Sequence, residues 1–198
     1  MTFTQSTGQI RAADGEIEHS AVALINLDGS NRRVIFQAPP YAADLLYPMM
    51  SPNGKQIVFE WFNSPSSTPA DREAIYVINT DGSGLTRLTP FAENDGDNPD
   101  WSPNGRWILF HSQVDDPSHQ AQIFLIHPDG TGRKKITHFK RGTFLGGYSF
   151  SPDGTSIVFA KGREGSRLHV YVMQLNGSHV RRVTRSKLWD SAPDWGPR

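Results

Sequence analysis

A four-residue turn motif recurs along this chain, and the regular spacing of its copies limits the possible folds more than any other feature. The motif reads Ser-Pro-Asn-Gly at Ser51 and at Ser102, and Ser-Pro-Asp-Gly at Ser151. Each copy is followed closely by a short apolar segment, Ile-Val-Phe or Ile-Leu-Phe. Repetition at a fixed period is the signature of an architecture in which one small unit is stacked on copies of itself.

A second landmark occurs four times, as an apolar run that ends in Asp-Gly or Asn-Gly. These dipeptides are typical of tight hairpins, and the Ser-Pro motif also favours a turn, because Pro fixes one φ angle and Gly accepts a positive one. In three copies a further short strand closes on a threonine, at Thr89, Thr137 or Thr184. Each repeat therefore predicts four short antiparallel strands. The apolar runs are Val22–Gly29, Ile75–Gly82, Ile123–Gly130 and Val170–Gly177.

Four such sheets predict a β-propeller, because a small sheet cannot bury both faces alone and radial stacking covers them. A β-sandwich uses the same hairpins but requires no such self-similarity. The segment 190–198 resembles 96–103, so we expect Pro193–Trp195 to pair beside Gly8–Ile10 and complete the first blade. The predicted fold is an all-β propeller of about four four-stranded antiparallel blades. The expected blades are 8–37 with 190–198, 45–90, 97–138 and 146–185.

Two other arrangements fit the same repeats. The chain is then either part of a longer propeller, or one of two open four-blade arcs that join around a two-fold axis. The matching ends favour closure within one chain, because closure removes two exposed sheet edges. We therefore expect a monomer, with the two-fold dimer as the alternative.

The motifs resemble the TolB-like propeller repeat, which is related to the WD-type repeats. The resemblance rests on Pro99–Gly105, which reads Pro-Asp-Trp-Ser-Pro-Asn-Gly, and on Ile75–Thr89, which holds the strand, the Asp-Gly-Ser turn and Arg-Leu-Thr. It covers the chain from about Val22 to Arg198. Similar repeats occur in TolB, in the propeller domains of some serine peptidases and in some polysaccharide lyases. The resemblance therefore implies a fold but no single activity, and we expect neither a Tol role nor peptidase activity.

Composition excludes several classes of function. The 20 basic side chains match the 20 acidic ones, so we expect no partner among nucleic acids or anionic membranes. There is no cysteine, and hence no disulfide, thiol nucleophile or thiolate metal site. The chain shows no apolar run long enough for a membrane span and no leader-like start. We expect a soluble protein, cytoplasmic by default or periplasmic if a leader has been removed.

Binding is expected at the loops between blades and between the second and third strands of a blade. These loops vary in length and sequence, and by analogy with other propellers they open on one face. Aromatic rings there give flat contact area and charged groups give orientation. The simpler interpretation is that the rings pack on adjacent blades. The candidate ligand-binding residues are Tyr41, Asp44, Phe91, Asp97, His138, Arg141, Trp189 and Asp190.

No metal, cofactor or catalytic residue is predicted. The segment Asp95–Asp100 resembles a calcium loop but lacks the bidentate acid at its far end. The seven histidines form no close ligand pair, and no nucleophile elbow or phosphate loop is present. The sequence favours a non-enzymatic scaffold that binds a protein or peptide at its loop-rich face. The alternative is a carbohydrate-active, lyase-like or small-ligand-binding propeller with an axial pocket.

Overall fold

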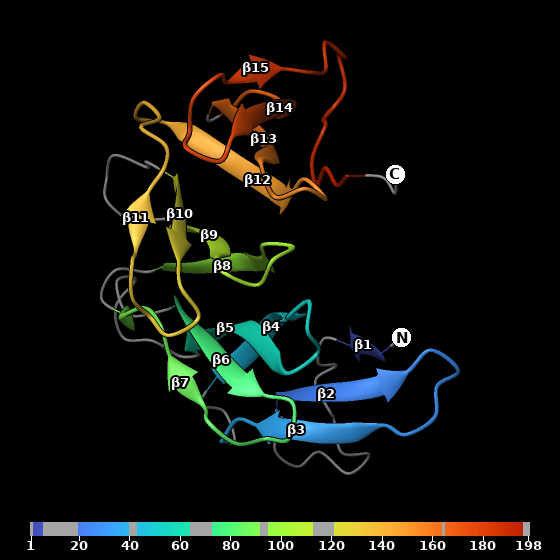
Figure 1. Ribbon diagram of the computed structural model, residues 1–198. Helices are drawn as coiled ribbons and strands as arrows, with labels where there is room; N and C mark the ends of the chain where they lie inside the picture. Colours follow the sequence, from blue (N-terminus) through green and yellow to red (C-terminus); the bar gives the residue numbers. More distant parts are fainter. Residues whose placement is uncertain are drawn as a thin grey trace. The chain divides into compact units, whose positions relative to one another are not determined.

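The computed structural model describes residues 2–5, 20–39, 43–63, 73–91, 95–112, 121–163 and 165–195, with the backbone alone for 2–5, 95 and 96. These residues form β-strands and turns, and none of them lies in an α-helix. The chain divides into two compact units, Met1–Pro99 and Asp100–Arg198. Each unit is described by itself below (Figure 1).

The first sheet of the first unit has three strands among the described residues. β1 (Thr2–Gln5) pairs antiparallel with β2 (Ala21–Asn26), which pairs with β3 (Arg33–Gln37). The sequence placed the strand beside β2 at Gly8–Ile10, which lies outside the described residues, whereas the structure pairs Thr2–Gln5 with β2. The alternation of threonine with an aromatic residue gives this segment the stronger preference for a strand.

The second sheet of the first unit is a four-stranded antiparallel blade. Its apolar face packs on the first sheet, and the shared core contains Val22 and Leu24 from β2 with Leu45, Ile57 and Phe59 from the blade. Burial of these side chains between two sheets is the main force that stacks neighbouring blades. The strands are β4 (Ala43–Met50), β5 (Gln56–Asn63), β6 (Glu73–Asn79) and β7 (Thr86–Arg87).

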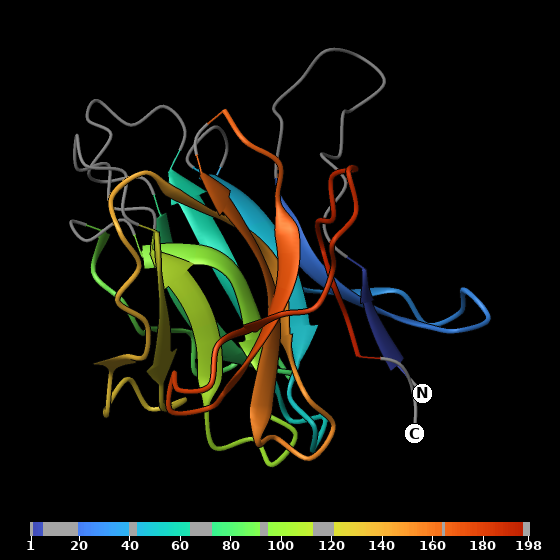
Figure 2. The ribbon, with the colours of Figure 1, turned by 90° about the horizontal axis from the view of Figure 1, so that it is seen from above.

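The second unit holds two further antiparallel blades, and the boundary between the units falls within β8. In the last blade, β12, β13 and β14 lie side by side (Figure 2). Its core joins Leu109 and Ile123 of one sheet to Leu145, Ile157 and Phe159 of the next. The predicted all-β fold of four-stranded antiparallel blades is therefore confirmed. The strands are β8 (Asp95–Trp101), β9 (Ile108–Ser112), β10 (Gln122–Ile126), β11 (Lys134–Lys135), β12 (Thr143–Phe150), β13 (Ser156–Arg163), β14 (His169–Gln174) and β15 (Arg181–Arg182).

The repeated motifs are turn-forming hydrogen-bond networks. The Ser51 hydroxyl donates to the Oδ1 of Asn53 at 2.8 Å and accepts the N–H of Gln56 at 2.9 Å, while Gly54 has a φ of +70°. The turns at Ser102 and Ser151 repeat these bonds. A serine hydroxyl, a short polar side chain and a glycine are therefore all required by one turn geometry.

The threonine that closes each repeat ties the fourth strand to the third. The Oγ1 atoms of Thr89 and Thr137 accept the N–H groups of Ile75 and Ile123 at 2.8 and 2.9 Å. In the last blade Thr184 repeats this bond at 3.0 Å. Because the bond forms at the end of the fourth strand, it fixes the point from which each inter-blade loop departs.

A left-handed residue before proline recurs three times, within β4, within β8 and in the segment that follows β15. Tyr47, Asn98 and Ala192 have φ values of +47°, +53° and +51°, and each precedes a proline. A positive φ costs a non-glycine residue of order 1–3 kcal/mol, so the surrounding sheet must hold it. The sequence analysis did not anticipate this feature.

Candidate functional site

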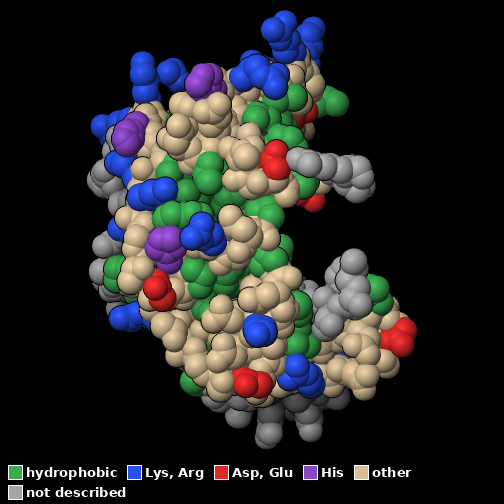
Figure 3. Space-filling view, viewed as in Figure 1, with side chains coloured by type: hydrophobic (Ala, Val, Ile, Leu, Met, Phe, Trp, Pro, Cys, Tyr) green, Lys and Arg blue, Asp and Glu red, His purple; other side chains and the backbone are tan. Residues whose placement is uncertain are grey.

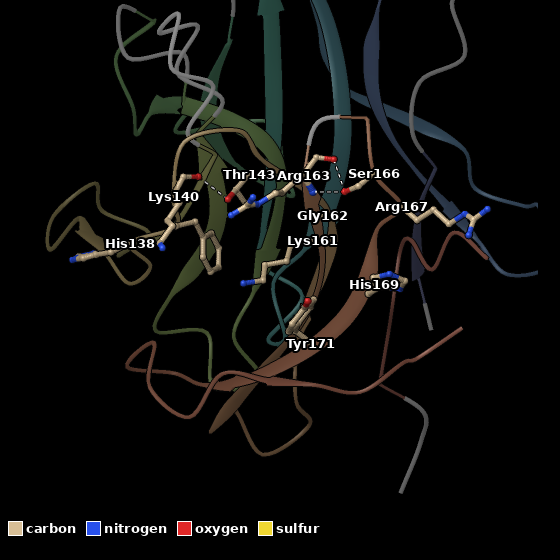
Figure 4. Close-up of a pocket in the computed structure, with 11 residues that line it drawn as sticks. His138, Lys140, Thr143, Lys161, Gly162, Arg163, Ser166, Arg167, His169 and Tyr171 are labelled. Carbon is tan, nitrogen blue, oxygen red and sulfur yellow. Dashed lines mark hydrogen bonds between the residues drawn. The ribbon is translucent and has the colours of Figure 1, made fainter. Parts of the chain in front are cut away.

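A pocket of about 480 Å³ lies in the second unit, where two loops meet (Figure 4). One is the inter-blade loop that follows β11, and the other connects β13 to β14. Loops of these two kinds were predicted to share a face, and here they line one cavity. The lining residues are His138, Phe139, Lys140, Thr143, Lys161, Gly162, Arg163, Ser166, Arg167, His169 and Tyr171.

Strand alternation places the central residues of the pocket on one face of the last blade. In β13, Phe159, Lys161 and Arg163 point to the same side, because successive side chains of a strand alternate. Strand pairing sets His169 of β14 beside Lys161, and Tyr171 beside Phe159. One sheet face therefore changes from an aromatic core at Phe159 to basic side chains at its loop end.

A buried glutamine fixes the loop that supplies the opposite wall. Gln122, only 6% exposed, accepts the N–H of Phe139 at 2.9 Å and donates to its carbonyl oxygen at 3.0 Å. The Thr137 hydroxyl donates to the same glutamine at 2.8 Å. These bonds hold the loop backbone, and the Phe139 ring packs against Phe159 with centroids 5.7 Å apart.

The pocket is strongly basic. Four lysine or arginine side chains and two histidines line it, and the described residues contribute no aspartate or glutamate to the lining. The Lys161 ammonium lies 4.6 Å from the Phe139 ring centre and 4.7 Å from that of Tyr171. Burial lowers the pKa of Lys161 below its usual value. Lys, Arg and His side chains are also frequent on the face formed by β11–β15 in Figure 3.

One acid lies behind the pocket and orients a histidine. The Asp190 Oδ2 is 3.3 Å from the His169 Nδ1 and accepts a 2.6 Å hydrogen bond from the Thr184 hydroxyl. That threonine bond, followed by the His169 contact, holds the pKa of Asp190 below its usual value. The imidazole of His169 is therefore held by a carboxylate while it lines the cavity.

The four sequence-predicted residues of the second unit differ in their relation to this pocket. His138 lines it, with its Nδ1 2.9 Å from the carbonyl oxygen of Thr137. Asp190 does not line the pocket, but it contacts the imidazole of His169, which does. Arg141 and Trp189 are exposed, Trp189 by 64%, and neither is a lining residue.

The other predicted residues belong to the first unit. Asp44 lies on β4 opposite Phe62, and Asp97 lies on β8. Phe91 packs 6.3 Å from the ring of Tyr76 and below the guanidinium of Arg87, as expected for a packing role. The remaining candidate, Tyr41, lies outside the described residues.

Asp97 belongs to an acidic cluster that the sequence analysis missed. Glu60, only 2% exposed, lies on β5, and burial raises its pKa to about 9, assisted by the negative charges of Glu73 and Asp97. One carboxyl oxygen of Glu60 has no hydrogen-bond partner among the described residues. Burial and the same three acids also raise the pKa of Tyr47. Glu60 is thus protonated, and uncharged, at neutral pH.

The sequence also missed Lys161 and Gln122 as residues of the candidate site. Lys161 stands two residues after the phenylalanine of its Ile-Val-Phe segment, and the other copies have Trp61 and Ser112 at this position. Comparison of the repeats would therefore have indicated Lys161. Among the described residues no group of three His, Asp or Glu side chains is arranged to hold a metal ion. That part of the chain also contains no helix with the length and apolar character of a membrane span.

Solved structures with similar folds include TolB-type propellers. A TolB-type protein from Agrobacterium tumefaciens is 25% identical with a TM-score of 0.68, over 91% of this chain and 60% of that one. TolB from Acinetobacter baumannii is 22% identical with a TM-score of 0.65, over 91% and 41%. An oligogalacturonate lyase in complex with manganese is 17% identical with a TM-score of 0.63, over 86% and 43%.

These likenesses support a TolB-like propeller fold and do not bear on a relation to WD-type repeats. The chain spans less than two thirds of the length of each of these structures. No protein-family model and no curated protein matches the sequence.

Proposed function

We propose that this chain is a non-enzymatic binding propeller that takes an acidic segment of a partner protein in the basic pocket of the second unit. The observation that carries the proposal is the lining itself, in which four lysines or arginines and two histidines gather, with no carboxylate among the described lining residues. Such a group of like charges repels itself, and an anionic ligand relieves that repulsion. The TolB-like fold is consistent with a protein partner.

The elements that form the pocket are suited to recognition. Lys161 and Arg163 stand on a strand, and the Phe139 loop is fixed by Gln122. Groups that are held before binding lose little conformational freedom when the ligand arrives. Basic clusters of this kind recognise acidic motifs through charge-assisted hydrogen bonds.

Fluorescence anisotropy of a labelled oligoglutamate peptide tests this proposal. We expect binding that weakens as salt is raised, because salt screens the ion pairs. Arg163→Gln should weaken binding by about fivefold, the loss of roughly 1 kcal/mol from a partly exposed ion pair. The charge-matched control is Arg106→Gln, since Arg106 is exposed and does not line the pocket. Equal losses in both variants, or no binding by the native protein, would refute the proposal.

The second candidate function is carbohydrate-active chemistry, and one observation favours it. His169 lines the pocket and is oriented by Asp190, an arrangement that suits proton transfer to or from a bound ligand. Release of new reducing ends from an oligogalacturonate, lost in His169→Gln, would support this candidate. If the oligogalacturonate is not cleaved, this second candidate is refuted and binding of an acidic segment remains the proposed function.

A further inference from the structure

The pocket has a counterpart in the first unit that is filled by a side chain. In the second blade Phe59 stacks on Tyr76 with centroids 5.9 Å apart and planes at 22°. In the fourth blade Phe159 stacks on Tyr171 at 5.7 Å and 22°. The two blades therefore present the same aromatic pair at the same strand positions.

The residue two positions after this phenylalanine differs between the two blades. In the second blade it is Trp61, whose indole lies 5.1 Å from the Tyr76 ring and 5.7 Å from the Phe36 ring. Its Nε1 donates to the Oδ1 of Asn63 at 2.9 Å, so its polar atom is satisfied within the blade. A complete aromatic side chain thus occupies the space between two aromatic walls.

In the fourth blade the same position is Lys161, between Tyr171 and Phe139. Its ammonium approaches both rings, at 4.7 and 4.6 Å, but its stem is far narrower than an indole. The space next to it is the pocket of about 480 Å³. The fourth blade therefore has the aromatic walls of the second blade without the ring that fills them.

We infer that the acidic ligand carries an aromatic residue among its carboxylates, and that its ring enters the space that Trp61 fills in the second blade. This inference rests on the proposed function and adds the aromatic requirement to it. The ring stacks on Phe139 and Tyr171, as aromatic pairs do at such separations. The Lys161 ammonium moves away from the two rings and pairs with a ligand carboxylate next to the entering ring. Arg163 pairs with a second carboxylate of the ligand. In the free protein the two cation–π contacts hold Lys161 at the entrance.

Isothermal titration calorimetry with three peptides tests the inference. The first is acetyl-Glu-Glu-Phe-Glu-Glu-amide, the second has alanine in place of its phenylalanine, and the third has glutamine in place of each glutamate. We expect the first to bind about tenfold more tightly than the second, because the phenylalanine ring buries apolar surface that the alanine lacks. The third should bind at least about tenfold more weakly than the first, because it lacks the charges.

Two variants place the effect at Lys161. Lys161→Trp copies the second blade and should close the pocket, so that the first peptide loses its advantage over the second. Lys161→Gln removes the charge and leaves the space, so that the advantage of the ring remains while overall affinity falls. Circular dichroism establishes that each variant is folded, and Arg106→Gln serves as the charge-matched control outside the pocket.

The outcomes separate the two proposals. Equal affinity for the first and second peptides overturns the aromatic requirement but leaves the acidic ligand standing. Equal affinity for the first and third peptides overturns the acidic ligand and the proposed function. An unchanged advantage of the ring in folded Lys161→Trp places the ring elsewhere and also overturns the inference.

Discussion

Replacement of Glu60 by glutamine should stabilise the protein at neutral pH and leave it unchanged in acid. Glu60 is 2% exposed on β5, where Leu46 and Ile75 of the neighbouring strands lie opposite it. Burial raises its pKa to about 9, and the charges of Glu73 and Asp97 add to this effect. The folded protein therefore keeps a proton on this carboxyl that the unfolded chain releases above pH 4.5.

The magnitude follows from the difference between these two pKa values. Folding takes up a proton between pH 4.5 and 9, so the stability contributed by this group falls as pH rises through that range. At pH 7 the penalty is about 3 kcal/mol, at 1.36 kcal/mol for each pH unit above the unfolded pKa. Glutamine has nearly the same shape, but its side-chain amide does not ionise in this pH range. We expect Glu60→Gln to gain up to about 3 kcal/mol at pH 7, or roughly 6–12 °C in Tm for a chain of this size.

Thermal melts of both proteins from pH 4.5 to pH 8.5 measure the effect. The acids whose charges act on Glu60 are Glu73 of β6 and Asp97 of β8, and the same acids act on the Tyr47 phenol. Glu73→Gln is the control, because it leaves Glu60 titratable and removes one repelling charge, so the melting temperature should still fall with pH, less steeply. A gap between Glu60→Gln and the native protein that is the same at pH 5 and pH 8 would refute the reasoning.

Three further predictions concern the fold. Gly177→Ala should lower the free energy of unfolding by more than about 3 kcal/mol, because a Cβ there collides with the carbonyl oxygen of Ile136. Gly165→Ala, with a similar φ and open space around it, should lower it by about 1–2 kcal/mol. Urea unfolding compares the two variants, and equal losses would contradict this explanation. Thr137→Val should cost about 1–3 kcal/mol in the same assay, because it leaves the buried N–H of Ile123 without its acceptor. A loss below about 0.5 kcal/mol would count against this role. Light scattering should give a mass near 22.1 kDa if the C-terminal segment completes the first blade within one chain, and about twice that mass if two chains form the ring.

The local chemistry of the repeats could be predicted from the sequence. The turn at Ser51 and the bond from Ile75 to Thr89 depend on residues close together in the chain, so each copy of the repeat contains the residues that form its own turns. Strand positions follow for the same reason. The exception is the strand beside β2, which was expected at Gly8–Ile10, outside the described residues, and which the structure has at Thr2–Gln5.

The candidate site could be predicted only in part. His138 and the meeting of two loop types were anticipated, because loop positions follow from the repeat. The pocket itself depends on which face of β13 carries Lys161 and on a clamp between Gln122 and Phe139, residues 17 positions apart. Contacts of this kind join residues that are distant in the chain, and a single sequence gives no direct signal for them. The pKa of Glu60 was missed for the same reason, since its burial is a property of the stacked sheets.

The most direct test of the central claim is a nuclear magnetic resonance titration of the isotope-labelled protein with acetyl-Glu-Glu-Phe-Glu-Glu-amide. We expect the largest amide shifts at Phe139, Lys161 and Arg163 and in the segment 166–171 that lines the pocket. The same shifts should be strongly reduced in Lys161→Trp. Shifts confined to residues of the first unit, or shifts in the second unit that persist unchanged in folded Lys161→Trp, would contradict the assignment of this pocket as the binding site.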